Sequence, residues 1–150
     1  MACAHIDNED RSTIPGEAGG LRRRPLSREE CLGRLRPGTV ARLARTEGAL
    51  PRIEVVRYCL IGDTIVIDPG SDALAAKLTG HVVALESGAT GADGPGDAWS
   101  VCAIGAVARS QGLSGDGTVL EMYPSLVSGW VDTRRGSEFS DSDLGNPVEG

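Results

Sequence analysis

Residues 51–86 read PRIEVVRYCLIGDTIVIDPGSDALAAKLTGHVVALE, and this stretch decides the fold. Ile53 and Val55 alternate with charged neighbours, which is the pattern of a half-buried β-strand. A tight turn at Gly62-Asp63 separates this strand from a second apolar run. The alternation, the turn and the second run together predict a β-hairpin over residues 52–68.

The residues after this hairpin predict a short helix and then another strand. Pro69-Gly70 breaks the sheet pattern, and either Ser71 or Asp72 can cap a helix over residues 73–78. The apolar run over residues 81–86 predicts the next strand. Strands joined by a glycine turn and a short helix are a common layout for holding a phosphorylated cofactor.

Upstream of the hairpin, the sequence predicts one more helix and one more strand. Ser27-Arg28-Glu29-Glu30 fits a capping box, in which the Ser27 side chain caps the helix and Glu30 reaches back to its start. Pro37-Gly38 ends this helix, and a strand is expected over residues 39–45.

Downstream, residues 99–108 predict a long strand of small residues, and residues 118–133 fit one or two further strands interrupted near Pro124. The elements then amount to six or seven antiparallel strands with two short helices. This predicts a mainly β fold, built as a small closed barrel.

Composition indicates one domain between two tails. The chain has 150 residues, enough for one core, and with 3% aromatic residues that core must consist of Val, Ile, Leu and Ala. Residues 1–24 lack apolar periodicity, and residues 136–150 are acidic and rich in Ser and Gly. Both tails are expected to be disordered, because neither buries enough apolar surface to offset the entropy of ordering. The folded unit is expected over residues 25–135.

Charge and hydropathy exclude two classes of partner. The net charge of −6 argues against a nucleic-acid partner, and the Arg22-Arg23-Arg24 run is expected to be a solvated linker. No apolar run approaches the ~20 residues needed to cross a bilayer, so no membrane partner and a cytoplasmic location are expected.

The cysteines and histidines do not predict a metal site. Four cysteines without a CxxC pair and only two histidines offer too few ligands at a recognisable spacing. Without a secretory signal, the cysteines are expected to be reduced thiols, mostly in the core; they are Cys3, Cys31, Cys59 and Cys102.

The order of these motifs resembles the pyridoxamine 5′-phosphate oxidase-like family, whose members are split β-barrels that bind FMN or the deazaflavin F420. The resemblance covers about residues 26–133. It rests on these segments in order: Leu26–Leu32, Val40–Ala44, the Gly62-Asp63 hairpin, Leu74-Ala75-Ala76, Val82–Glu86 and Trp99-Ser100-Val101.

This resemblance implies a homodimer with a flavin in a groove between the two chains. The ring would pack on the strand at residues 52–57, and the phosphate would lie where the strand ending near Asp68 meets the following turn and helix. The implied function is a flavin-binding oxidoreductase with a small-molecule ligand, and no catalytic residue is implied. The implied cofactor-binding residues are Arg52, Glu54, Val55, Arg57, Ile67, Asp68, Ser71 and Trp99.

The phosphate end of this site departs from the family pattern. In the family the strand usually ends in Arg-Thr and leads to a Ser-Lys or Thr-Lys pair, whereas this chain has Asp68-Pro69 and Asp72-Ala73. Between Arg57 and Arg109 the sequence contains a single cation, Lys77. Because a charge-assisted hydrogen bond contributes about 1.5–3 kcal/mol, the loss of an Arg and a Lys predicts a weakened phosphate site.

Two functions follow from these observations. One is a flavin- or deazaflavin-dependent oxidoreductase, and the other is a cofactor-free split-barrel dimer that serves as a binding or regulatory protein. Arg57 and Tyr58 are equally suited to face a bound ring or a partner chain. Trp99 and Cys102 fit packing roles better than site roles.

Overall fold

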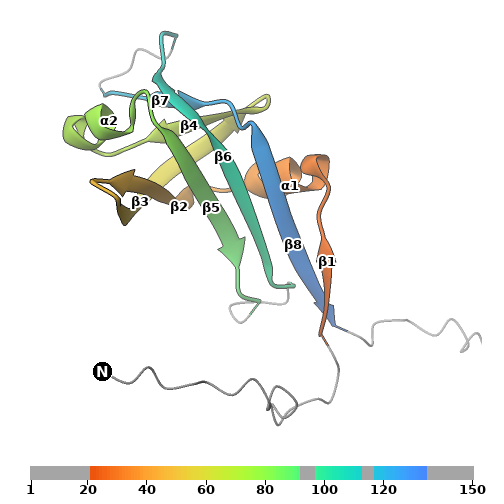
Figure 1. The fold of residues 1–150 in the computed structure, drawn as a ribbon. Helices are drawn as coiled ribbons and strands as arrows, with labels where there is room; N and C mark the ends of the chain where they lie inside the picture. Colours follow the sequence, from red (N-terminus) through yellow and green to blue (C-terminus); the bar gives the residue numbers. More distant parts are fainter. Residues whose placement is uncertain (1–20, 92–96, 113–116, 135–150) are drawn as a thin grey trace, which may run out of the picture.

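The computed structural model describes residues 21–91, 97–112 and 117–134. In these ranges the chain forms one antiparallel sheet of eight strands, with two helices (Figure 1). In chain order the elements are β1 (Leu21–Pro25), α1 (Arg28–Leu35), β2 (Val40–Glu47), β3 (Leu50–Ile61), β4 (Thr64–Asp68), α2 (Asp72–Leu78), β5 (Val82–Ala89), β6 (Trp99–Arg109), β7 (Leu120–Met122) and β8 (Leu126–Arg134).

Six of the strands close into a barrel. β6, β5, β2, β3, β4 and β7 are neighbours in this order, and β7 pairs back onto β6. β8 and β1 continue the sheet from the other side of β6, outside the closed part (Figure 1). The predicted mainly β split barrel with two short helices is confirmed, and the two additional strands bring the described sheet to eight.

The barrel divides at Gly105 of β6. The part of β6 up to Ile104 pairs with β8, whereas the part from Val107 onward pairs with β7. A Cβ atom at Gly105 would lie 2.5 Å from the carbonyl oxygen of Tyr123, closer than real side chains come. Glycine therefore permits the connection between β7 and β8 to approach β6, and this approach allows both pairings.

Aliphatic side chains fill the barrel, as the low aromatic content requires. Tyr58 is a buried exception, and its Oη donates a hydrogen bond of 2.9 Å to the carbonyl oxygen of Leu35 at the end of α1. Tyr58 therefore faces neither a bound ring nor a partner chain, and that expectation is wrong for this residue. Large side chains of the core with less than 2% exposure include Leu43, Ile65, Ile67, Leu78, Leu85, Val101, Leu120 and Met122.

Both helices begin as predicted. Ser27 Oγ accepts a hydrogen bond of 3.2 Å from the backbone of Glu30, and Glu30 Oε2 accepts one of 2.8 Å from the backbone of Ser27. The capping box of α1 is therefore confirmed. At α2, Ser71 is the cap, because its Oγ accepts a hydrogen bond of 3.2 Å from the backbone of Leu74.

The folded part begins earlier than predicted. β1 pairs with β8 from Leu21 onward, so Arg22-Arg23-Arg24 is a strand and not a linker. Arg23 donates hydrogen bonds of 2.9 and 3.0 Å to the Asp132 carboxylate, and its guanidinium lies 3.6 Å from the ring centroid of Trp130. Composition could not indicate this strand, because its partner edge and its anchoring side chains come from the other end of the folded unit.

Most of the predicted tail residues and one of the four cysteines fall on residues that the structure does not describe. Tail residues 1–20 and 136–150 lie outside the described part of the chain, as does the first cysteine. The other three cysteines are free, and Cys31 is buried, Cys59 exposed and Cys102 half-buried. The prediction of mostly core cysteines is wrong for the last two, because alternation places them on the outer faces of β3 and β6.

The apolar residues at the start of β3 predict that Ile53 and Val55 face the interior. The structure places the opposite face of the strand inward. Ile53 and Val55 are 69% and 71% exposed, whereas Glu54 shares the inward face with Val56 and Tyr58. The alternation is present, but at this end of the barrel the polar side faces inward. The reason is an ion-pair network that occupies the inner side.

Candidate ligand groove

A groove opens where β3 extends beyond β4. Residues 57–61 of β3 pair with β4, whereas among the described strands residues 50–56 pair with β2 alone. The chain leaves β4 at Asp68 and turns into α2, so the free edge of β3 and α2 border a groove of about 380 Å³. This volume is within the range of small-molecule sites. The groove is lined by Arg45, Glu54, Val55, Pro69, Gly70, Ser71, Ala73, Leu74 and Lys77.

An ion-pair network borders this groove. Arg45 Nη2 lies 3.4 Å from the Glu47 carboxylate and 3.2 Å from the Glu54 carboxylate. Arg52 Nε and Lys77 Nζ lie 3.5 and 3.2 Å from the same Glu47 carboxylate. The Lys77 hydrogen bond, followed by that of Arg45, lowers the pKa of Glu47 below its ordinary value. Three cations against two carboxylates leave this network with one surplus positive charge.

Arg45 holds a buried donor that no residue in the described part of the chain satisfies. Only 7% of its side chain is exposed, and its Nε has no hydrogen-bond partner among the described residues. A buried donor without an acceptor costs about 1–3 kcal/mol, and more when the group is charged. An acceptor oxygen supplied by a ligand would remove this cost.

A second hollow of about 550 Å³ lies on the other side of the turn before α2 and is acidic. Asp68 Oδ1 accepts a hydrogen bond of 2.9 Å from the backbone of Gly70, and Asp72 Oδ1 accepts one of 2.6 Å from Thr118 Oγ1. Both carboxylates line this hollow and neither lines the groove beside β3. An anion is therefore repelled from the second hollow and attracted to the groove.

Four of the eight predicted site residues lie at the groove. Glu54, Val55 and Ser71 line it, and Arg52 joins it through its contact with Glu47. The Ser71 hydroxyl is already engaged as the cap of α2.

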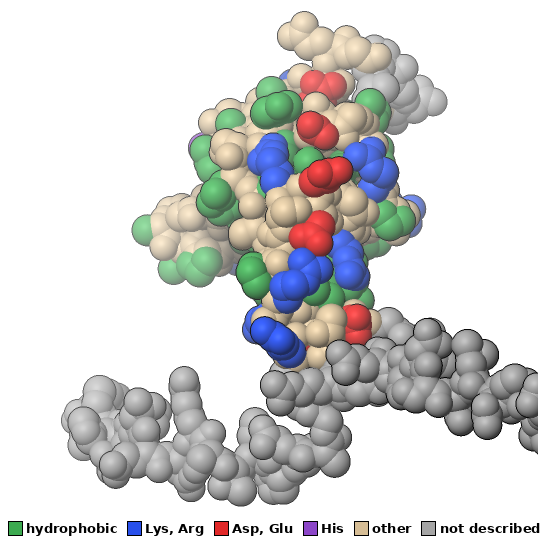
Figure 2. Space-filling view, turned by 90° about the vertical axis from the view of Figure 1, so that its right-hand side faces the viewer, with side chains coloured by type: hydrophobic (Ala, Val, Ile, Leu, Met, Phe, Trp, Pro, Cys, Tyr) green, Lys and Arg blue, Asp and Glu red, His purple; other side chains and the backbone are tan. Residues whose placement is uncertain are grey.

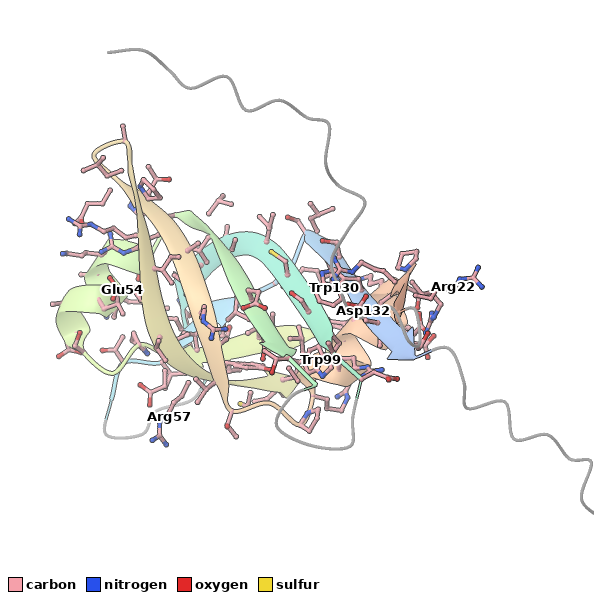
Figure 3. The ribbon with its side chains drawn as sticks, turned by 90° about the horizontal axis from the view of Figure 1, so that it is seen from below. Arg22, Glu54, Arg57, Trp99, Trp130 and Asp132 are labelled. Carbon is pink, nitrogen blue, oxygen red and sulfur yellow. The ribbon has the colours of Figure 1, made fainter. Side chains whose placement is uncertain are left out.

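The other four predicted residues lie elsewhere. Asp68 lines the second hollow, and Ile67 is fully buried in the barrel, so its side chain is not available to a ligand. Arg57 is exposed at an outward position of β3. Trp99 lies beside α1, well apart from Glu54 (Figure 3).

Sequence reasoning missed Arg45 and Lys77, which line the groove, and it missed Glu47, which pairs with both. A signal existed for Arg45 and Glu47, because alternation with Ala41 and Leu43 places them on the inner face of β2. The scarcity of cations between Arg57 and Arg109 does not extend to this groove, which Arg45 and Lys77 line. Arg45 and Arg52 come from before this stretch, and they lie together because they are register partners in the hairpin of β2 and β3.

An apolar row crosses the outer face of the sheet on five neighbouring strands. In register, Ile53 of β3 lies beside Ala44 of β2, which lies beside Ala84 of β5, Ile104 of β6 and Leu126 of β8. Its two ends, Ile53 and Leu126, are 69% and 57% exposed. Such a continuous apolar row on the outside of a barrel is typical of a surface that another molecule covers.

The side of the molecule that carries α1 and β1 differs in character. Basic and acidic side chains are intermixed there (Figure 2). They include the ion pairs Arg23–Asp132 at 2.9 Å and Arg24–Glu30 at 3.0 Å. This charged face is suited to water, which leaves the apolar row as the better candidate for an interface.

The architecture matches several solved structures, among them two of FAD-binding proteins. A FAD-binding protein from Mycobacterium smegmatis superposes with a TM-score of 0.62 at 16% identity, covering 73% of this chain and 98% of that one. A FAD-binding protein from Mesorhizobium loti gives 0.61 at 19% identity, covering 76% and 99%. A Corynebacterium glutamicum protein assigned provisionally as a pyridoxamine 5′-phosphate oxidase gives 0.60 at 19% identity, covering 73% and 92%.

The fold of this chain is therefore that of the pyridoxamine 5′-phosphate oxidase-like split barrels, and the resemblance read from the sequence is confirmed at the level of the fold. No protein-family model matches the sequence, and no curated protein is similar to it. In the described part of the chain, no helix is long and apolar enough to cross a bilayer. The same residues contain no group of three or more His, Cys, Asp or Glu side chains that could hold a metal ion.

Proposed function

We propose that this protein binds a flavin-type cofactor, FMN or F420, in the groove between β3 and α2 and acts as an oxidoreductase. The observation that carries the proposal is the pairing of an apolar wall with a cationic end in one groove. Val55, Pro69 and Leu74 supply the wall, and Arg45 and Lys77 supply the cations. A flavin nucleotide has the matching parts, a planar ring system and an anionic tail.

The free edge of β3 suits the ring of such a cofactor. Residues 50–56 pair on one side only, so backbone donors and acceptors on the other side face the groove. The polar edge of a flavin ring can hydrogen-bond to such groups. When bound, the flavin supplies hydride transfer, and the protein supplies the groove and its charges.

The anionic tail requires a different set of residues from the family pattern. The positions that usually carry Arg and Lys are Asp68 and Ala73 here, and the carboxylates of Asp68 and Asp72 line the second hollow. In this proposal the tail lies beside Arg45 and Lys77, which line the groove. The phosphate site at the usual place is weakened, and the network with a surplus positive charge takes over its role.

We also propose that the protein is a homodimer, joined through the apolar row on the outer face of the barrel. A second copy would bury Ile53, Ile104 and Leu126, which otherwise remain at the surface to different degrees. Trp99, which lies apart from the groove of its own chain, belongs to a cofactor site only if the partner chain brings it there.

Visible absorption and ligand titration test the cofactor proposal. The freshly purified chain is expected to show a flavin band, or to bind added FMN or F420 with a rise in its thermal midpoint. Ligand at 100 times its Kd would add about 2.7 kcal/mol of stability. Lys77→Gln is expected to weaken FMN binding more than riboflavin binding, because riboflavin lacks the phosphate.

The second function is a cofactor-free dimer that binds or regulates another molecule. The replacement of the usual Arg and Lys by Asp68 and Ala73 favours it. A colourless protein whose midpoint does not shift with excess FMN or F420 would contradict the oxidoreductase proposal and support this one.

A further inference from the structure

The Glu47 carboxylate lies where the cations of the groove converge. Arg45 reaches it from β2, Arg52 from β3 and Lys77 from α2, at 3.4, 3.5 and 3.2 Å. One negative charge is therefore shared by three positive side chains. A phosphate group carries more charge and more acceptor oxygens than a carboxylate, so it would satisfy these three donors better.

Arg45 provides a second, independent observation. Its side chain is more than nine-tenths buried, it lines the groove, and its Nε has no partner among the described residues. Because a buried charged donor is costly to leave unpaired, such an atom marks a position where an acceptor from a ligand is stabilising.

We infer that Arg45, Arg52 and Lys77 form a binding site for the phosphate group of the ligand, and that Glu47 occupies this site until the ligand displaces it. The inference rests on the proposed function in one respect, namely that the groove is the ligand site. Glu54 keeps its contact with Arg45 during the exchange. Binding replaces one internal anion by an external one, and the cations stay paired throughout.

Glu47 is placed to leave this position without disturbing the core. It is the last residue of β2 and precedes a turn in which Gly48 and Ala49 have left-handed backbones, with φ of 53° and 64°. Its side chain is 40% exposed, so a change of rotamer carries the carboxylate into water. The side chains of Arg52 and Lys77 are 57% and 52% exposed, which leaves both accessible to a ligand.

Calorimetric titration of the full-length chain with inorganic phosphate, at constant ionic strength, tests the inference. Glu47→Gln removes the competing charge and keeps the shape of the side chain, so we expect phosphate to bind about ten-fold more tightly than in the wild-type chain. Lys77→Gln in the Glu47→Gln background removes one of the three donors and is expected to reverse this gain.

Glu86→Gln is the matched control. Glu86 pairs with Arg42 at 3.3 Å, outside the groove lining, and its side chain is 35% exposed, close to the value for Glu47. This control removes the same amount of negative charge and is expected to leave phosphate binding unchanged. A gain in Glu86→Gln as large as that in Glu47→Gln overturns the inference, because it shows an effect of net charge alone.

Equal phosphate affinity in the wild-type and Glu47→Gln chains also overturns the inference. If Glu47→Gln does not fold, the Glu47→Asp variant is titrated with phosphate instead. Its shorter side chain withdraws the carboxylate from Lys77 and is expected to raise phosphate affinity, and unchanged affinity counts against the site.

Flavin titrations separate this inference from the proposed function. Failure of FMN and F420 to bind contradicts the flavin proposal, while tighter phosphate binding by Glu47→Gln still upholds the site. Conversely, equal binding of FMN and riboflavin with no effect of Glu47 upholds the flavin proposal and overturns the phosphate site.

Discussion

At the scale of single residues, Arg45 determines the charge of the groove. Its position in β2 directs the guanidinium inward, and the carboxylates of Glu47 and Glu54 accompany it. A buried guanidinium must be paired, because removal from water costs several kcal/mol if it is not compensated. The two glutamates therefore have a structural role even when no ligand is bound.

Glu47 is expected to make the stability of the fold depend on pH. Lys77 and Arg45 hold its pKa below the ordinary value of 4.5. A carboxylate whose pKa is depressed in the folded state contributes stability above its unfolded-state pKa and loses it as the pH falls through the folded-state pKa. Glu47→Gln should therefore be less stable than the wild-type chain at neutral pH, and the difference should shrink below pH 4.5. Urea unfolding at several pH values measures this, and a constant difference would contradict it.

Tyr58→Phe tests the hydrogen bond that joins β3 to α1. The substitution removes the donor to the Leu35 carbonyl and leaves that acceptor buried. We expect a loss of about 1 kcal/mol in the free energy of unfolding, because the carbonyl keeps its hydrogen bond of 3.0 Å from the backbone of Gly38. Tyr123→Phe is the control, because Tyr123 is 66% exposed and its substitution should change little. Equal effects of the two changes would argue against the role of this bond.

At the scale of elements, the change of partner strand along β6 depends on a close approach between two segments of backbone. β6 changes partner from β8 to β7 around Gly105, where the connection between β7 and β8 passes close by. Any side chain at this position meets backbone atoms, which cannot move aside as a flexible side chain could.

Gly105→Ala is expected to destabilise the fold by about 2 kcal/mol or more, because overpacking against backbone forces the strands apart. Gly33→Ala in α1 is the comparison, since its new Cβ would meet no atom within 4 Å. That change should stabilise the helix by up to about 1 kcal/mol, as alanine is the better helix former. Thermal unfolding of both variants measures whether each change lowers or raises stability. If Gly105→Ala leaves stability unchanged, the strands around Gly105 can adjust to a side chain, which contradicts the prediction.

Local signals predicted most of the elements but not all of them. The Ser27 capping box, the Ser71 cap and the Gly62-Asp63 turn each depend on residues close in sequence, and the structure has helices and a hairpin where these signals place them. β1 was missed because a strand of three arginines has no apolar pattern. It forms only because β8 offers an edge and Asp132 binds Arg23.

At the scale of the whole molecule, the apolar row on the outer face is the feature that the monomer leaves unexplained. If it is a dimer interface, the purified chain should sediment at twice its mass of 15.6 kDa. Leu126→Glu places a charge at the end of this row and is expected to shift the protein toward the monomer. Analytical ultracentrifugation over a range of concentrations measures the shift.

Ile61→Glu is the control for this experiment. Ile61 is 55% exposed, close to the 57% of Leu126, but it lies at the β3–β4 turn, outside the row. It should leave the dimer intact. Dissociation by both variants would point to a general loss of stability, and a monomeric wild-type chain would remove the dimer proposal.

Some residues of the candidate site could be predicted from the sequence, and others could not. Glu54, Val55 and Ser71, which were assigned to one site from the sequence, line one groove in the structure, since the hairpin and the helix that carry them are adjacent along the chain. Ile67 was also assigned to this site, although alternation turns that side chain into the core.

The amino-acid sequence by itself determined the helices, the hairpin and the barrel class, because caps, turns and strand alternation act over a few residues. Only the tertiary structure decided the charge of the groove and the inward face of β3. The hairpin of β2 and β3 brings Arg45, Glu47 and Arg52 together, but the packing of α2 beside this hairpin places Lys77 next to Glu47, and that contact depends on distances in space that a local pattern does not encode.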